Sequence, residues 1–207
     1  MVFHATHRVP VCPCVAPYEK LPVRIGGPTP ATVADAQGRW RVHLNSMKEG
    51  QHLTLMVQSS NTIVVTDVLT GEIWLGSGQS NMGMQVKEAN DIAAEQAAAN
   101  MPEIRMFTVT PSSSPTPLED CRGSWQVCSS NTVGNFSAPL FFFGREIYQQ
   151  LKTPVGLIHS SWGGTPIQPW ISLEVLQAYP GYAALLERKK KEVAEWPERK
   201  KKIEAAQ

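Results

Sequence analysis

The stretch Gly71-Glu-Ile-Trp-Leu-Gly-Ser-Gly-Gln-Ser-Asn-Met82 decides the fold of this chain. Its apolar run Ile73-Trp-Leu75 is typical of a short strand buried on both faces. Gly76 and Gly78 allow the backbone to turn sharply after that strand. Ser80 then lies near the start of the following helix, where outward-pointing N–H groups favour negative charge. The pattern predicts that the Ser80 hydroxyl lies at the carboxyl edge of a sheet. The alternative is a tight turn with a purely structural role, which would show the same glycine spacing.

A second glycine-rich loop, Ser160-Ser-Trp-Gly-Gly-Thr165, follows another predicted buried strand at Val155 to Ile158. Parallel strands bring such loops to the same edge of a sheet, and ligands bind outside the carboxyl ends of the strands. We therefore expect the two loops to form one site.

Helices and strands alternate around these loops. Helices are predicted from Asn90 to Asn100 and from Ser137 to Leu151, with a strand from Ile104 to Val109 between them. Alternation of this kind implies right-handed crossovers and a parallel sheet covered by helices, which is an α/β fold.

Four segments are predicted along the chain. Residues 1–30 contain six prolines and form an irregular lead, and residues 31–70 form a partial small β-sandwich of short strands with short turns. Residues 71–184 form the α/β part. Residues 185–207 form a charged helical segment, a solvated face rather than a nucleic-acid arm, which Pro197 should kink or break.

Composition excludes several classes of partner. The 207 residues carry a formal net charge of +1, which predicts no strong attraction to nucleic acid or to a membrane surface. The sequence has no apolar run of the roughly 18 residues that a membrane helix needs. The first 14 residues lack the uninterrupted apolar stretch of a secretory signal.

Common site motifs are missing around Ser80. Gly78-Gln-Ser-Asn-Met82 lacks the second glycine of a G-x-S-x-G elbow, which argues against the α/β-hydrolase fold. The sequence also lacks a Walker A motif and the third glycine of a dinucleotide fingerprint. Phosphate and nucleotide sites are therefore not predicted.

Three blocks resemble the sialate O-acetylesterases, a carbohydrate esterase group within the SGNH hydrolases. Gly71 to Met82 resembles their nucleophile block, Phe136-Ser-Ala-Pro-Leu-Phe-Phe-Phe-Gly-Arg145 the helix that follows, and Pro154-Val-Gly-Leu-Ile-His-Ser-Ser-Trp-Gly-Gly-Thr165 their second conserved block. The resemblance runs from about Gly38 to Trp170. It implies an SGNH (flavodoxin-like) three-layer αβα fold, incomplete here, preceded by a partial small β-sandwich domain.

The resemblance also implies a function, namely hydrolysis of O-acetyl esters on carbohydrates through an acyl-enzyme, with no metal or other cofactor. Ser80 matches the nucleophile, and its own N–H is an oxyanion donor. Gly163 or Gly164 matches a further N–H donor. The remaining candidates, which shape the site and bind substrate, are Gln79, Asn81 and Thr165. The family likeness also suggests a secreted or periplasmic location.

The catalytic base is missing from the sequence. In the family it is a histidine of an Asp-x-x-His block, preceded by a Gly-Glu-Ser block with another oxyanion donor. Neither block occurs here, and none of the five histidines follows an aspartate by three positions. His159 lies beside the second loop and is the candidate for a substitute base, although packing alone is the simpler reading. We therefore expect this chain on its own to be inactive or nearly so.

Other functions fit parts of the sequence. A non-catalytic carbohydrate-binding module, an acetylxylan esterase and a β-sandwich interaction module are the alternatives. An incomplete parallel sheet also predicts self-association through an exposed edge.

The cysteines allow two further hypotheses. Cys121 and Cys128 could form a disulfide across a short loop, or remain small, partly buried thiols. His4 and His7 with Cys12 and Cys14 suggest zinc, but the Cys-x-Cys spacing is tighter than that of usual zinc sites.

Overall fold

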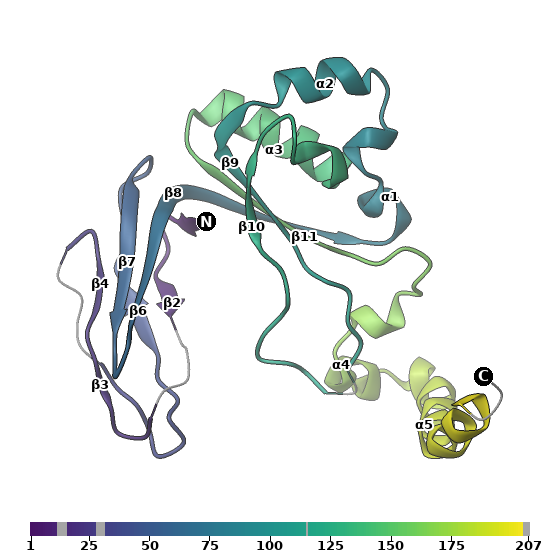
Figure 1. Ribbon diagram of the computed structural model, residues 1–207. Coiled ribbons are helices and arrows are strands. Elements are labelled where there is room, and N and C mark those ends of the chain that lie inside the picture. Colours follow the sequence, from purple (N-terminus) through teal and green to yellow (C-terminus); the bar gives the residue numbers. More distant parts are fainter. Residues whose placement is uncertain (12–15, 28–31, 115, 205–207) are drawn as a thin grey trace. The chain divides into compact units, whose positions relative to one another are not determined.

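One long strand, β8 (Thr62–Gly78), runs through the largest sheet of the computed structural model (Figure 1). The structure describes residues 1–11, 16–27, 32–114 and 116–204. Contacts divide the chain into two units, Met1–Gly163 and Gly164–Gln207, and each is described by itself.

Seven strands of the first unit form one mixed sheet with the order β10-β9-β11-β8-β7-β4, and β1 also pairs with β8. The other six strands of this sheet are β1 (Val2–His4), β4 (Val23–Ile25), β7 (His52–Gln58), β9 (Met101–Thr108), β10 (Trp125–Cys128) and β11 (Val155–Ser161). Strands β1, β8, β11 and β9 run parallel, while β10, β7 and β4 are antiparallel to their neighbours. The predicted α/β class with a largely parallel central sheet is confirmed.

The strands predicted at 62–65 and 73–75 are two parts of β8. The chain bends at Asp67, whose φ is 59°, but strand pairing continues on both sides of the bend. The boundary predicted between the segments 31–70 and 71–184 therefore lies inside β8. The sequence did not indicate one continuous strand, because Asp67 and Gly71 are of residue types that are depleted in strands.

The bend at Asp67 is fixed by a buried arginine. The guanidinium of Arg105 on β9 donates to both carboxylate oxygens of Asp67, with Nη2 2.8 Å from Oδ1, and its Nε donates to the Pro102 carbonyl at 2.7 Å. Arg105 is buried, and its hydrogen bond lowers the pKa of the Asp67 carboxyl. These bonds connect β9 to the bend in β8, two strands that are separated in the sheet by β11.

Residues 1–30 differ from the irregular lead that the prolines suggested, because β1 to β4 lie there. Strands β2 (Val9–Val11) and β6 (Val42–Leu44) pair with each other, as do β3 (Lys20–Leu21) and β5 (Thr32–Val33). Each has two or three residues, too few to show an alternating pattern. A second hydrophobic cluster lies among these strands; its most buried members include Leu21, Val23, Leu44 and Val68. The small β-sandwich remains a prediction.

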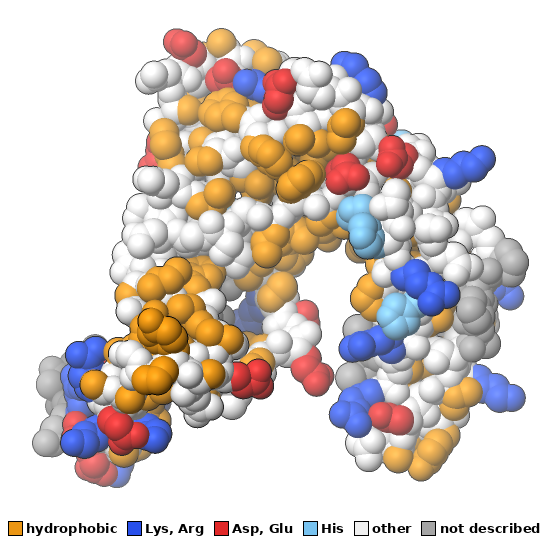
Figure 2. Space-filling view, turned by 180° about the vertical axis from the view of Figure 1, so that it is seen from behind, with side chains coloured by type: hydrophobic (Ala, Val, Ile, Leu, Met, Phe, Trp, Pro, Cys, Tyr) orange, Lys and Arg blue, Asp and Glu red, His pale blue; other side chains and the backbone are white. Residues whose placement is uncertain are grey.

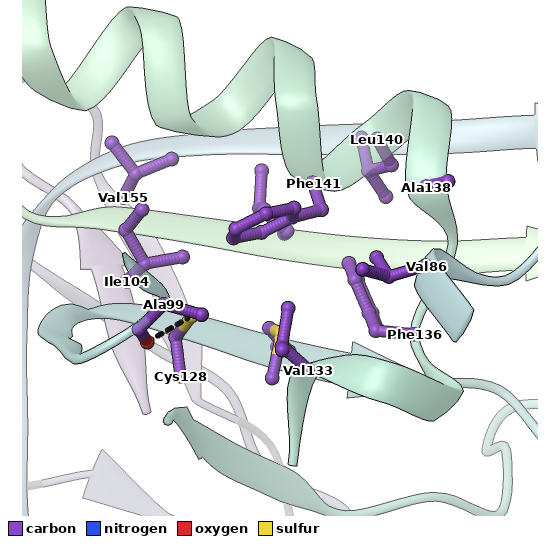
Figure 3. Close-up of a cluster of buried hydrophobic side chains, with 12 residues drawn as sticks. Val86, Ala99, Ile104, Cys128, Val133, Phe136, Ala138, Leu140, Phe141 and Val155 are labelled. Carbon is purple, nitrogen blue, oxygen red and sulfur yellow. Dashed lines mark hydrogen bonds between the residues drawn. The ribbon is translucent and has the colours of Figure 1, made fainter. Parts of the chain in front are cut away.

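The helices of the first unit cover one face of the parallel strands (Figure 1). They are α1 (Ser80–Gly83), η1 (Val86–Glu88), α2 (Ile92–Ala98), η2 (Val133–Asn135) and α3 (Ala138–Leu151). Helix α3 starts as predicted, with Ser137 as the N-cap and Pro139 in the first turn. Its Phe141 packs into a core with Ile104 of β9 and Val155 of β11 (Figure 3).

The second unit is helical, with η3 (Gln168–Trp170), α4 (Leu173–Ala178), η4 (Pro180–Tyr182) and α5 (Ala183–Glu204). Helix α5 runs through Pro197 without the expected break. Ion pairs support the helix on both sides of the proline, Lys189 with Glu192 and Lys201 with Glu198. In the described part of the chain, the helices lack the combination of length and apolarity that crossing a membrane requires.

The two cysteine hypotheses have different outcomes. Cys121 and Cys128 are both free thiols, so the disulfide is wrong. Cys128 is buried, its Sγ donates to the Ala99 carbonyl at 3.3 Å, and burial raises its pKa to about 11 (Figure 3). Cys12 and Cys14 lie outside the described residues. Among the residues that are described, no three His, Cys, Asp or Glu side chains gather as metal ligands would.

The close approach of β8 to the start of β11 yields a first prediction. A Cβ at Gly71 would lie 1.9 Å from the Pro154 carbonyl oxygen. Gly71→Ala should therefore lower the free energy of unfolding by about 3 kcal/mol, measured by urea titration. Gly27→Ala is the matched control, since a Cβ there meets nothing within 4 Å. Equal stability of the two variants would contradict this packing.

Candidate active site

Ser80 lies on a sharp turn at the carboxyl end of β8. Gly78 has a φ of 138°, a backbone conformation that favours glycine, and Ser80 is the first residue of the one-turn helix α1. Two backbone bonds close the turn, from Gly83 N to Gln79 O at 2.9 Å and from Met84 N to Ser80 O at 3.0 Å. The Ser80 side chain is exposed. The sequence-predicted position of this hydroxyl is thus observed.

The second glycine loop lies beside this turn. Strand β11 pairs with β8 as far as Ser161 opposite Gly78, and Trp162 N donates to the Gly78 carbonyl at 3.1 Å. A Cβ built on Gly163 would lie 3.6 Å from Ser80 Oγ. The predicted convergence at one edge of the sheet is observed for the part of the second loop that belongs to the first unit, as far as Gly163.

Two backbone N–H groups lie at this edge, those of Ser80 and Gly163. The two residues are neighbours in space, since a Cβ on Gly163 would lie 3.8 Å from Ser80 Cα. Backbone donors beside a nucleophile are what a tetrahedral oxyanion requires. The arrangement therefore offers a hydroxyl and two donors within one small area.

The other predicted site residues divide between the two units. Gln79 and Asn81 flank Ser80 on the same turn and are exposed. Gly164 and Thr165 begin the second unit, where Gly164 has a φ of 75° and Thr165 Oγ1 accepts a hydrogen bond from Trp170 Nε1 at 2.9 Å. The roles of these four residues stay predictions.

A buried serine, Ser137, contacts the turn that carries Ser80. Ser137 donates its hydroxyl to the Met82 carbonyl at 2.7 Å, and Ala138 N donates to the Met84 carbonyl at 2.7 Å. The same Ser137 hydroxyl caps helix α3 by accepting from Leu140 N. Sequence reasoning identified Ser137 only as a cap, because the second contact joins residues 55 positions apart.

His159 has a different partner from the one that a catalytic base would need. Its Nε2 lies 2.6 Å from Ser161 Oγ, and no hydrogen bond joins it to Ser80 among the described residues. Its ring contacts Phe136 edge to face, and Ser161 Oγ lies 3.4 Å from the position of a Cβ on Gly83. Burial lowers the pKa of His159, an effect that the Met82 backbone opposes. A neutral His159 therefore packs with Ser161 against α1.

This geometry is typical of one class of protein. A nucleophilic side chain on a tight turn after a parallel strand, next to backbone donors of a second loop, is how serine hydrolases on open α/β sheets arrange their acyl-transfer chemistry.

The family model for carbohydrate esterases described as sialic acid-specific acetylesterases matches residues 70–205. The chain belongs to this family.

Curated relatives and a solved structure agree with this assignment. A sialate O-acetylesterase from Rattus norvegicus is 38% identical over 167 residues, which are 71% of this chain and 30% of that protein. The Homo sapiens sialate O-acetylesterase is 38% identical over 153 residues, 67% of this chain and 29% of that protein. A carbohydrate acetylesterase from Xanthomonas citri superposes with a TM-score of 0.82 at 32% identity, covering 84% of this chain and 41% of that one. The chain thus spans less than half the length of each of these relatives.

The environment of His159 predicts a pH effect on stability. Because the folded-state pKa lies below the ordinary value, the unfolded chain binds the proton more readily. The free energy of unfolding should therefore fall as the pH drops below about 6.5 toward the folded pKa. His159→Gln should remove this part of the decline in urea titrations between pH 7 and pH 5.

His43→Gln is the control, because His43 is an exposed histidine on β6. It should keep the wild-type slope. If His159→Gln left the pH dependence of the free energy of unfolding unchanged, the pKa of His159 would be the same in the folded and the unfolded chain, which would contradict the prediction.

Proposed function

We propose that this chain carries the nucleophile side of a serine esterase site that removes O-acetyl groups from carbohydrates. The observation that carries the proposal is the position of Ser80 on an exposed turn, 3.6 Å from where a Cβ on Gly163 would be. Membership of the acetylesterase family supports the substrate class.

Each site residue has a proposed role. Ser80 Oγ attacks the acetyl carbon, and its proton passes to a base while the carbonyl oxygen becomes an oxyanion. The N–H groups of Ser80 and Gly163, or of Gly164, stabilise that oxyanion. The intermediate collapses as the bond between the acetyl carbon and the sugar oxygen breaks, and that oxygen takes the proton from the base and leaves as a hydroxyl. Water, deprotonated by the same base, then hydrolyses the acetyl–Ser80 ester, which releases acetate and restores the Ser80 hydroxyl. Gln79 and Asn81, which flank Ser80, shape the site and contact the sugar.

The base is proposed to come from polypeptide outside residues 1–207. The sequence contains no Asp-x-x-His block, and His159 bonds to Ser161 instead of Ser80. The matched relatives are much longer than this chain, which leaves them room for such a block. Under the same proposal, the full family fold is the three-layer SGNH arrangement with a small β-sandwich in front.

A missing base can be replaced by a small molecule, and this is the basis of the test. Loss of one triad member costs about four to six powers of ten in rate, so hydrolysis of p-nitrophenyl acetate by the chain alone should be near background. Added imidazole should raise the rate of the wild-type chain above that of Ser80→Ala. The difference between the two proteins corrects for hydrolysis by imidazole itself.

Ser77→Ala is the matched control, because Ser77 is an exposed serine near the end of β8, the strand that leads to Ser80. It should retain the increment due to imidazole. Imidazole-independent activity that Ser80→Ala abolishes would show a base within the chain, with His159 the first to replace. An increment that survives Ser80→Ala would reject Ser80 as the nucleophile.

A further inference from the structure

Two histidines and a threonine meet at the turn that follows β1. His4 Nδ1 lies 3.1 Å from His7 Nδ1, and Thr6 Oγ1 lies 3.3 Å from the first nitrogen and 3.2 Å from the second. The two imidazole planes stand at 86° to each other. Three polar atoms thus form an almost equilateral triangle that is exposed to solvent. Figure 2 shows histidine side chains open to solvent on one face of the molecule.

Hydrogen bonds alone do not satisfy this triangle. A ring nitrogen either carries a proton and donates, or has a free lone pair and accepts. No more than two of the three contacts can therefore be full hydrogen bonds. A cation would accept a lone pair from all three atoms at once. The arrangement therefore favours a positive ion that binds to nitrogen.

The size of the triangle fits a divalent transition metal ion. Zinc lies about 2.0–2.1 Å from a histidine nitrogen, so two ligands of a tetrahedral ion are about 3.3 Å apart. Ligands at right angles, as in tetragonal copper or nickel sites, are about 2.9 Å apart at the same bond length. The three separations in the triangle, 3.1, 3.2 and 3.3 Å, lie within this span. Imidazole is a ligand that suits all three metals.

A carboxylate faces the other nitrogen of one ring. Glu72 Oε2 lies 3.9 Å from His4 Nε2. Histidines that bind a metal commonly direct their second ring N–H at a carboxylate, which fixes the tautomer and leaves the first nitrogen free to coordinate. The negative charge of Glu72 favours a proton on His4 Nε2, and so a free lone pair on His4 Nδ1.

The backbone between the two histidines is held in place. Ala5 is buried, its N–H donates to the Gly71 carbonyl at 3.0 Å, and its carbonyl accepts from Met47 N at 2.8 Å. Pairing of β1 with β8 puts His4 opposite Gly71, next to Glu72 in the sequence. Ligands that are already ordered bind more tightly, because less conformational entropy is lost on binding.

We propose that His4 and His7 bind a divalent ion of zinc, copper or nickel through their Nδ1 atoms, with the Thr6 hydroxyl or a water as a third ligand. Glu72 supports His4 from the other side of its ring. The site has two histidines, and a hydroxyl takes the place of a third His, Cys, Asp or Glu ligand. Bound metal links the turn after β1 to β8. The site shares no residue with the Ser80 turn, so its metal binding is measured without any esterase assay.

The test is a titration of the full chain with Zn²⁺. Thiols bind the same ion, so the titration is repeated on a variant in which Cys12, Cys14 and Cys121 are replaced by serine. Calorimetry should show one Zn²⁺ per chain with a micromolar dissociation constant in both proteins. The thermal unfolding midpoint should rise with the Zn²⁺ concentration, because the ion binds the folded chain. Long-range proton–nitrogen NMR spectra should show the Nδ1 signals of both histidines shifting on binding.

His7→Ala should weaken Zn²⁺ binding at least about a hundredfold, because it removes a ligand, and Glu72→Gln should weaken it about tenfold. His7 is exposed, so His7→Ala should keep the unfolding midpoint of the metal-free chain. His52→Ala is the matched control. His52 Nε2 also faces a carboxylate, Glu103 Oε1 at 4.0 Å, but among the described residues no hydrogen bond or ring contact joins it to another histidine. Its affinity should stay within about twofold of the wild type.

Three results would overturn the proposal. Zn²⁺ binding that His7→Ala leaves unchanged would place the ion elsewhere on the chain. Binding that disappears when the three cysteines are replaced would assign the ion to thiols. Absence of saturable binding in both proteins would leave His4 and His7 as a hydrogen-bonded pair.

Discussion

The fold depends on backbone hydrogen bonding along a single strand. β8 pairs with β7 over its first part, with β1 over a short central part and with β11 over its last seven residues. The bend at Asp67 redirects the strand without ending it, and the Arg105 guanidinium holds that bend from β9. The direction of the final residues, and so the position of Ser80, follows from this pairing. Moving β8 by one residue would turn every side chain on it to the other face.

Several elements could be predicted because their signals are local. Ser137 and Pro139 mark the start of α3, and the apolar run from Val155 marks β11. The strands of residues 1–30 could not be predicted, because two- and three-residue strands are ordered by partners far along the chain. Helix α5 passes through Pro197, and ion pairs lie on both sides of the proline, but the local preference alone predicts a break there.

For the site, glycine spacing and strand order were enough to bring Ser80 and Gly163 together. They could not supply the contacts beneath the turn, since Ser137 with Met82 and His159 with Ser161 are side-chain contacts that only packing determines. These contacts hold α1 on β11 and α3. The hydrogen bonds from Ser137 to Met82 and between His159 and Ser161 join side chains far from Ser80 in sequence to the turn and its neighbouring strand.

The continuity of β8 also bears on how such a protein can change during evolution. A recombination point near residue 70 would cut a strand whose two parts serve different neighbours. The front β segment could not be exchanged for an unrelated one without re-creating the same pairing. Insertions and fusions should instead accumulate in connections such as residues 109–124, between β9 and β10, where no strand is interrupted. Any replacement of the front β segment would therefore have to supply a strand that continues into the Glu72–Gly78 part of β8.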